Sequence, residues 1–221
     1  MISKRCLCEA YRFIDPIAYL ITKYLDVTPP ASLFIDNKGY SAQFTRIDHI
    51  TPRTKLELYE KAKIFTIRGY RRECTYEYPK DGWYAHAYAL AGNPVLFIDR
   101  AYPFDGPHSE AARKNPIPGW IDEFPEDDRE DFLLHHIACR VDNIDRVMED
   151  MRKDGMDFGN VLSGYNGKLL QVFTKPVMLM GAKSKKPVAG TVFELIYRDP
   201  SLNDWDFIKE QASELMMKQS I

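Results

Sequence analysis

Three short stretches of the sequence each carry a good metal ligand in the middle of a predicted β-strand. They are RIDHIT at 46–51, LLHHIACRV at 133–141 and GTVFELIYRD at 190–199, and the ligands are His49, His136 and Glu194. Two imidazoles and one carboxylate form the facial triad that holds the metal in non-heme iron(II) oxygenases. If the three side chains converge in the fold, the sequence predicts a mononuclear metal site of this kind.

Alternation along the strand distinguishes the two adjacent histidines of the second stretch. Residues i and i+2 share one face of a sheet, so His136 lies with Ala138 and Arg140, while His135 lies on the opposite face with Ile137. The face of His135 is the more apolar one and is expected to lie under a helix. We therefore predict that His136 is the ligand and that His135 has a packing or hydrogen-bonding role.

The carboxylate of the third stretch supports a metal site. Glu194 shares a strand face with Val192 and Ile196. An ionised carboxylate in such a place is costly unless it is paired or bound to a metal. A neighbouring arginine would also meet this need, but the combination with two histidines at matching positions favours the metal.

The elements that must position these ligands occur twice in the same order. Each set begins with a ligand-bearing strand, continues with a helix that ends at a glycine, and closes with three β-like stretches. The predicted strands cover 44–51, 70–78, 83–90 and 94–101 in the first set and 133–141, 156–162, 168–175 and 191–198 in the second. We therefore predict an α+β fold in which two βαβββ modules form a curved mixed sheet around a metal-centred cavity.

Capping residues mark the starts of the two helices. Thr54 and Glu57 have the spacing of a capping box and predict a helix that runs to about Arg68. Asp142 and Asn143 can cap the second helix, which would run to about Lys153.

The segments outside the repeat complete the predicted organisation. Apolar residues at helical spacing predict an N-terminal lead-in, which we expect to pack on the core or on a second subunit of a homodimer. Proline and charge predict a linker between the modules, a Lys- and Pro-rich hairpin insert at 176–190, and a terminal helix over about 204–218. The predicted division is a helical lead-in at 1–43, a first module at 44–101, a linker at 102–131, a second module at 132–200 and a C-terminal helix at 201–221.

The two modules differ at one informative position. Aligning Arg100 with Arg198 places Leu96 where Glu194 stands. Leucine cannot bind a metal, so the pair of modules would supply three ligands and leave metal positions open. An open site permits substrate and O₂ to bind, whereas a closed four-ligand site is typical of a structural metal.

Composition excludes several classes of partner. The net charge of −2 and the scattered Lys and Arg residues give no reason to expect nucleic acid or an anionic membrane. No apolar run approaches the roughly 18 residues that span a bilayer, and the N-terminus lacks the apolar core of a signal peptide. Cys6, Cys8, Cys74 and Cys139 are expected to be reduced thiols. We therefore expect a cytoplasmic protein that acts on a small molecule.

The element order and ligand positions resemble those of the vicinal oxygen chelate superfamily. The second module is similar to the catalytic domain of 4-hydroxyphenylpyruvate dioxygenase, over HHIACRVDNID at 135–145, GKLLQVFTKP at 167–176 and GTVFELIYR at 190–198. The resemblance implies metal ligation by His49, His136 and Glu194. It also implies a glutamine that lines the substrate site, at Gln171. The helical lead-in followed by DHITPRT also looks like the 2-oxoadipate dioxygenase/decarboxylase family.

This resemblance leads to our first functional hypothesis, an iron(II) dioxygenase that binds a 2-oxo acid and O₂. Gln171 would act on the bound substrate, and alternation places Phe173 beside it. Arg53 or Arg140 would pair with the substrate carboxylate, and Trp205 and Phe207 would form an apolar lid.

Two other hypotheses remain open. One is a redox-neutral lyase, isomerase or hydrolase in which Zn²⁺, Ni²⁺ or Mn²⁺ acts as a Lewis acid. The other is a non-catalytic protein that binds a small ligand in the same cavity.

Overall fold

The computed structural model describes residues 43–124, 132–176, 178–209 and 212. The predicted helical lead-in and the thiols of Cys6 and Cys8 therefore lie outside the described residues, while Cys74 and Cys139 are free thiols. None of the helices in the described ranges has the length and apolar character needed to cross a membrane.

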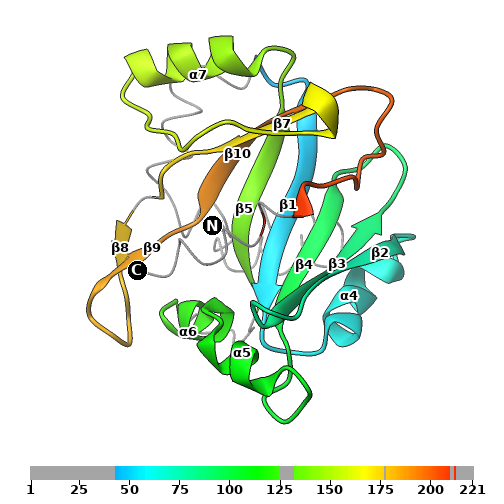
Figure 1. The fold of residues 1–221 in the computed structure, drawn as a ribbon, viewed down its shortest axis with the longest axis vertical. Helices are drawn as coiled ribbons and strands as arrows, with labels where there is room; N and C mark the ends of the chain where they lie inside the picture. Colours follow the sequence, from blue (N-terminus) through cyan, green and yellow to red (C-terminus); the bar gives the residue numbers. More distant parts are fainter. Residues whose placement is uncertain (1–42, 125–131, 177, 210–211, 213–221) are drawn as a thin grey trace, which may run out of the picture.

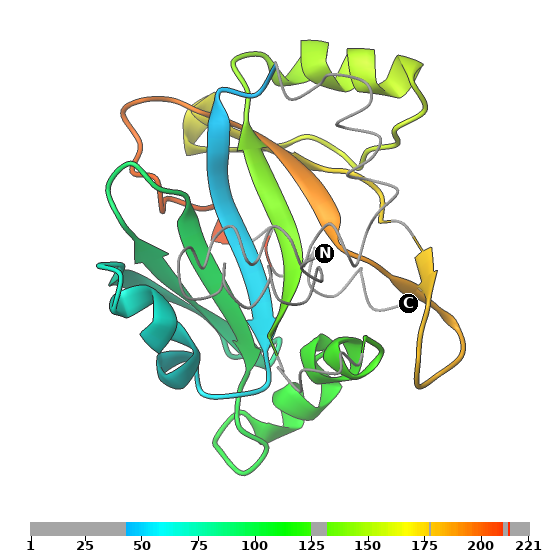
Figure 2. The ribbon, with the colours of Figure 1, turned by 180° about the vertical axis from the view of Figure 1, so that it is seen from behind.

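One curved, eight-stranded mixed sheet forms the centre of the molecule, which confirms the predicted α+β fold (Figures 1 and 2). In sheet order the strands are β2 (Arg71–Tyr78), β3 (Trp83–Ala89), β4 (Val95–Ala101), β1 (Arg46–Thr54), β5 (Phe132–Arg140), β10 (Val192–Arg198), β7 (Leu169–Phe173) and β6 (Leu162–Gly164). We call β1–β4 the first half of the sheet and β5, β10, β7 and β6 the second half. In each half the first strand of the chain lies parallel to the last, and β1 and β5 pair antiparallel at the centre.

Two helices cover the outer face of the sheet. They are α4 (Leu58–Thr66) in the first half and α7 (Ile144–Lys153) in the second, and their apolar sides share one core with the outward side chains of both halves. The inner face is also covered, so β4 and β10 are buried almost throughout. Strands buried on both faces have nearly continuous apolar sequences, as VLFIDRA and VFELIYR do.

The predicted cap of the second helix is confirmed and that of the first is wrong. The Asn143 side chain accepts a hydrogen bond from the backbone N–H of Arg146 at the start of α7. Thr54 instead ends β1, and its Oγ1 accepts a hydrogen bond from Leu56 N. Helix α4 begins at Leu58, because Thr54 is the last residue of the strand and a bend at residues 55–56 follows it.

The segment predicted as a linker contains two short helices, α5 (Ser109–Lys114) and α6 (Ile117–Asp122). Pro116 and Pro118 lie at the start of α6, where proline is tolerated because first-turn N–H groups have no partner within the helix. Trp120 of α6 is buried against the inner face of the sheet. The predicted insert is a hairpin, formed by β8 (Met178–Met180) and β9 (Pro187–Ala189).

The chain after β10 does not start a helix at 204, contrary to prediction. Residues 204–208 form a turn and irregular structure, and most of the predicted helix lies outside the described residues. The Arg198 guanidinium donates hydrogen bonds to the carbonyls of Asn203 (2.8 Å) and Asp206 (2.7 Å). Because these carbonyls bind a side chain, they do not accept the backbone hydrogen bonds of a helix.

Two β-bulges interrupt the central pair of strands. Ile47 and His49 of β1 oppose the adjacent residues Cys139 and Ala138 of β5, so Asp48 is an extra residue. In the same way Thr51 and Pro52 oppose His136 and Leu134, so His135 is an extra residue in β5. Each bulged residue immediately precedes a predicted metal ligand. Bulges of this kind redirect side chains and are frequent next to active sites.

Candidate metal centre

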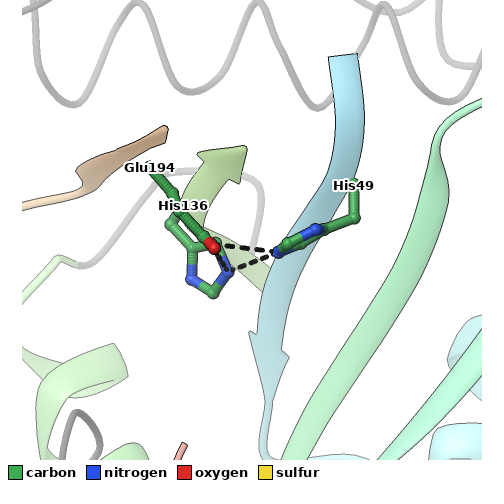
Figure 3. Close-up of side chains that lie close together, drawn as sticks. All are labelled: His49, His136 and Glu194. Carbon is green, nitrogen blue, oxygen red and sulfur yellow. Dashed lines mark hydrogen bonds and ion pairs between the residues drawn. The ribbon is translucent and has the colours of Figure 1, made fainter. Parts of the chain in front are cut away.

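The three predicted ligands converge on the inner face of the sheet. His49, His136 and Glu194 come from the neighbouring strands β1, β5 and β10, and all three side chains are buried (Figure 3). The Nε2 atoms of the histidines are 3.2 Å apart. Oε2 of Glu194 lies 3.1 Å from His49 Nε2 and 3.5 Å from His136 Nε2. The three atoms therefore form a compact triangle.

This triangle has the dimensions of one face of a metal coordination sphere. Metal–ligand bonds of about 2.1 Å place neighbouring ligand atoms about 3.0 Å apart in octahedral and about 3.4 Å apart in tetrahedral geometry. Glu194 Oε2 is buried and has no hydrogen-bond partner among the described residues, which is costly for a carboxylate oxygen unless a cation binds it. The donor set fits iron(II) and also Zn²⁺, Ni²⁺ or Mn²⁺.

Gln171 fixes the orientation of the carboxylate. Its Nε2 donates a hydrogen bond of 2.6 Å to Oε1 of Glu194, which leaves Oε2 directed at the two histidines. Gln171 is buried and does not line the adjacent cavity. Phe173, also predicted in the site, places its ring in edge contact with His136, at 5.5 Å between centroids. Both residues thus contact the candidate ligands.

The bulged residue Asp48 holds the other nitrogen of His49. Asp48 Oδ1 lies 3.0 Å from His49 Nδ1, and the carboxylate also receives hydrogen bonds from Arg140 and Arg198. Burial alone would raise the pKa of Asp48, but His49 and Arg198 outweigh it and hold that pKa far below its usual value. Burial would lower the pKa of His49, but Glu194 and Asp48 raise it to about 9.

The bulged residue His135 lies within hydrogen-bond distance of the other nitrogen of His136, as Asp48 does for His49. The two Nδ1 atoms lie 2.9 Å apart. If His136 presents Nε2 to a metal, its Nδ1 carries the proton and His135 Nδ1 accepts it, which fixes both tautomers. The prediction that His135 faces the opposite side of the sheet is therefore wrong. The bulge restarts the alternation, so both histidines face inward and line the same cavity.

An ion network centred on the buried Asp48 and Arg198 side chains connects His49 to the segment that follows β10. Arg140 bonds to Asp48 and, at 3.0 Å, to Asp204, while Arg198 links Asp48 to the carbonyls of Asn203 and Asp206. The segment then places the ring of Phe207 over the site, 6.3 Å from the ring of His49. Apolar cover from this segment excludes water from the ligands.

A small cavity extends from the ligands into the first half of the sheet. About 30 Å³ of it is open to the centres of water molecules. Aromatic and small side chains form most of its wall, and Tyr76, Tyr78 and Trp83 among them carry a polar group. The other polar lining residues are Thr51, Arg53, Asp99, His135 and His136. Of the two predicted substrate-binding arginines, Arg53 lines this cavity. Arg140 does not, because its guanidinium is bound to Asp48 and Asp204.

The strand register corrects the predicted match to Glu194. His49 pairs with Val95 and His136 with Val192, so the first-half position that matches Glu194 is Phe97, two residues further along β4. Leu96 belongs to the outer core instead. The Phe97 ring contacts His49 edge-on, at 5.0 Å between centroids. Phenylalanine cannot bind a metal. The expected number of ligands is therefore still three, although the sequence predicted that number from Leu96 and not from Phe97.

Sequence reasoning missed Asp48 and Asp99 and placed His135 on the wrong face, although it predicted a packing or hydrogen-bonding role for that residue. Asp48 and His135 lie at bulges, which alternation cannot reveal, although each directly precedes a candidate histidine ligand. Asp99 is buried beside Arg53, and a carboxylate inside the apolar strand VLFIDRA is the signal that would have found it.

No protein-family model and no curated protein sequence matches the chain. Hydroxyglutarate synthase from Oryza sativa, in complex with 2-oxoadipate, is 15% identical, with a TM-score of 0.68 over 96% of this chain and 93% of that one. A protein described as a glyoxalase superfamily member, from Ralstonia eutropha JMP134, is 18% identical, with a TM-score of 0.62 over 82% and 81%. A triple mutant of 4-hydroxymandelate synthase from Streptomyces coelicolor is 16% identical, with a TM-score of 0.54 over 79% and 54%.

At these identities the similarity concerns the fold. It covers 93% and 81% of the first two chains, and it extends over the part of this chain that forms the curved mixed sheet. The chain therefore has the vicinal oxygen chelate fold.

Proposed function

We propose that the protein is a mononuclear iron(II) dioxygenase that acts on a small 2-oxo acid. The observation that carries this proposal is the buried triangle of His49 Nε2, His136 Nε2 and Glu194 Oε2 beside a cavity. The fold shared with hydroxyglutarate synthase, which binds 2-oxoadipate, supports the substrate class. Iron(II), when bound, supplies the redox chemistry that couples decarboxylation of a 2-oxo acid to the use of O₂.

The chain's own residues prepare the ligands. Gln171 holds Oε1 of Glu194, so the carboxylate presents a single oxygen. Asp48 and His135 hold the Nδ1 atoms of the two histidines, so both imidazoles present Nε2. Partners of this kind raise the basicity of a ligand and fix its orientation.

Other residues shape the substrate space. Phe97 and Phe207 lie against His49 and keep that side of the site apolar. Arg53 is the arginine that remains as a candidate to hold the end of the substrate remote from the metal, because it lines the cavity. A dry site strengthens every charge interaction within it.

A redox-neutral, metal-dependent lyase or isomerase is the second candidate. Asp99 favours it, since this buried carboxyl lines the cavity and burial, opposed by Arg53 and His49, raises its pKa to about 7. A carboxyl with such a pKa is suited to accept and return a proton near neutral pH.

Anaerobic loading with Fe(II), followed by O₂ uptake and CO₂ release with a panel of 2-oxo acids, separates these functions. Coupled O₂ uptake and CO₂ release support the dioxygenase. Metal binding without O₂ consumption supports the lyase or isomerase, and ligand binding without any turnover points to a binding protein.

Metal content of variants tests the site itself. The double variant His136→Ala/Glu194→Ala is expected to lose bound metal, measured by elemental analysis on protein purified without a metal-affinity column. Glu149→Ala, at an exposed position of α7, is the matched control and should retain it. Unchanged metal content in the double variant would show that the metal binds elsewhere.

A further inference from the structure

The end of the cavity away from the ligands carries three polar side chains from three strands. Arg53 of β1 and Asp99 of β4 are register partners, and Trp83 of β3 lines the same space. Arg53 follows His49 by four residues, so their Cα atoms are about 13 Å apart along β1. A small molecule that reaches from the metal ligands along the cavity would meet this polar end.

Arg53 and Asp99 form a buried ion pair. The Nε atom of Arg53 lies 4.0 Å from Oδ2 of Asp99, which is too far for a hydrogen bond between these two atoms, and both side chains are almost fully buried. The Trp120 ring lies against the guanidinium, at 5.2 Å, and is itself fixed by a hydrogen bond to Ala189 O. The pair is therefore held in place with a gap that a ligand group can bridge.

Trp83 adds a donor to this end. Its indole stacks on Tyr78, with the ring centroids 4.0 Å apart, and is buried. Its Nε1 has no hydrogen-bond partner in the described part of the chain. A buried N–H without an acceptor is costly, and a ligand carbonyl would satisfy it.

The charges at this end select against a second carboxylate on the ligand. The carboxylate of Asp99 offsets the charge of Arg53, and another anion placed there would face Asp99 in a site shielded from water. Like charges opposed in such a place weaken binding strongly. A neutral group that both accepts and donates hydrogen bonds would instead complement the opposite charges of Arg53 and Asp99 and would give the Trp83 N–H an acceptor.

We propose that the cavity binds a 2-oxo acid whose far end is a neutral donor–acceptor group, of which a primary carboxamide is the simplest. Its carbonyl accepts from Arg53 and Trp83, and its amide N–H donates to Asp99. The 2-oxo acid part of this inference rests on the proposed function, whereas the nature of the far end rests on Arg53, Asp99 and Trp83.

Three non-reacting ligands of nearly equal length test the far end. N-oxalylglycinamide ends in a carboxamide, N-oxalylglycine in a carboxylate, and N-oxalylethylamine in a methyl group, while all three share one metal-chelating head. Titration calorimetry with Zn²⁺-loaded protein at pH 8.5, where Asp99 is ionised, gives the dissociation constants. The carboxamide is expected to bind about tenfold or more tightly than the carboxylate.

The variant Asp99→Asn sharpens the test. It removes the negative charge, so the carboxylate ligand is expected to gain affinity and the preference to reverse, while binding of the methyl-ended ligand changes little. Tighter binding of the carboxylate to the unaltered protein overturns the inference without any variant, and leaves the proposed function standing. Failure of all three ligands to bind overturns both.

Discussion

The two halves of the sheet share one strand order but use their inward positions differently. In the second half, Glu194 on β10 binds Gln171 and opposes Phe173 on β7, so large side chains fill the inner face. In the first half, the matching position on β4 is Phe97, which opposes Ala87 on β3. The second half therefore provides the carboxylate and its support.

The first half provides room. Ala85 and Ala87 occupy the β3 positions that match Gln171 and Phe173, judged from the pairing of β3 with β4 and of β7 with β10. The cavity opens beside Ala85, whose partner on β4 is Asp99. The two halves thus differ in their inward positions: the second half carries the carboxylate of the candidate site, and the first half carries the cavity.

The largest effect is expected when this asymmetry is removed. Phe97→Glu places a carboxylate at the position that matches Glu194 and would close the metal site with a fourth ligand. We expect the variant to retain metal against a chelator at least as well as the unaltered protein, but to lose O₂ uptake. Phe97→Leu is the control for lost aromatic packing. Full O₂ uptake by Phe97→Glu would mean that this position does not face the open side of the metal.

Asp99, which lies in the first half, should make the free energy of unfolding of the protein depend on pH. Burial raises its pKa from 3.8 to about 7, so between these values the folded protein binds a proton that the unfolded chain has released. Its contribution to stability is complete below pH 3.8 and is lost as the pH rises through 7. The stabilisation by Asp99→Asn, relative to the unaltered protein, should therefore grow with pH and level off at up to about 4 kcal/mol.

Urea unfolding of both proteins at pH 4, 6 and 8 measures this difference. Asp105→Asn changes an exposed aspartate and serves as the control. Parallel pH profiles for Asp99→Asn and the unaltered protein would show that burial does not disfavour the charged form of Asp99.

His135 tests how the second half supports its ligand. His135→Phe removes the acceptor for Nδ1–H of His136 and is expected to weaken metal binding about 10- to 100-fold. His135→Asn, which can accept the same proton, should recover part of the affinity. Competition with a chromogenic chelator measures both. Equal loss in the two variants would point to packing instead of the hydrogen bond.

The smallest expected effect concerns the N-termini of the two outer helices, α7 and α4. Asn143→Ala removes the cap of α7 and is expected to cost about 1 kcal/mol of unfolding free energy. Glu57 precedes α4 without a side-chain cap bond in the described chain, so Glu57→Ala should cost less. Thermal unfolding of the two variants compares the helices, and equal losses would contradict a special role for Asn143.

The three candidate ligands and the order of the elements could be predicted from the sequence, because both depend on local patterns. His49, His136 and Glu194 stand in strands with clear apolar signals, and Asn143 begins an evident helix. The match of Leu96 to Glu194 failed by one residue, because register depends on strand pairing across the sheet. The Arg100 and Arg198 side chains look equivalent in the sequence but do not occupy equivalent places.

The bulges and the short helices were not accessible. An extra residue in a strand leaves the composition unchanged, so nothing in LLHHIACRV marks His135 as bulged. Helix α6 is short and begins with proline, and the burial of Trp120 against the sheet stabilises it more than its own sequence does. Tertiary packing decided these features, and packing is invisible to a local pattern.

Because Asp48 and His135 are extra residues at bulges, each could be removed without changing the pairing of the residues around it. If His135 were deleted, the pairs Leu134–Pro52 and His136–Thr51 would follow each other directly in a regular ladder. If Asp48 were deleted, the same would hold for the pairs Ile47–Cys139 and His49–Ala138. A one-residue deletion elsewhere in these strands would turn every following side chain to the wrong face. Either supporting residue can therefore be gained or lost through the insertion or deletion of a single codon, while the three candidate ligands keep their places in the sheet.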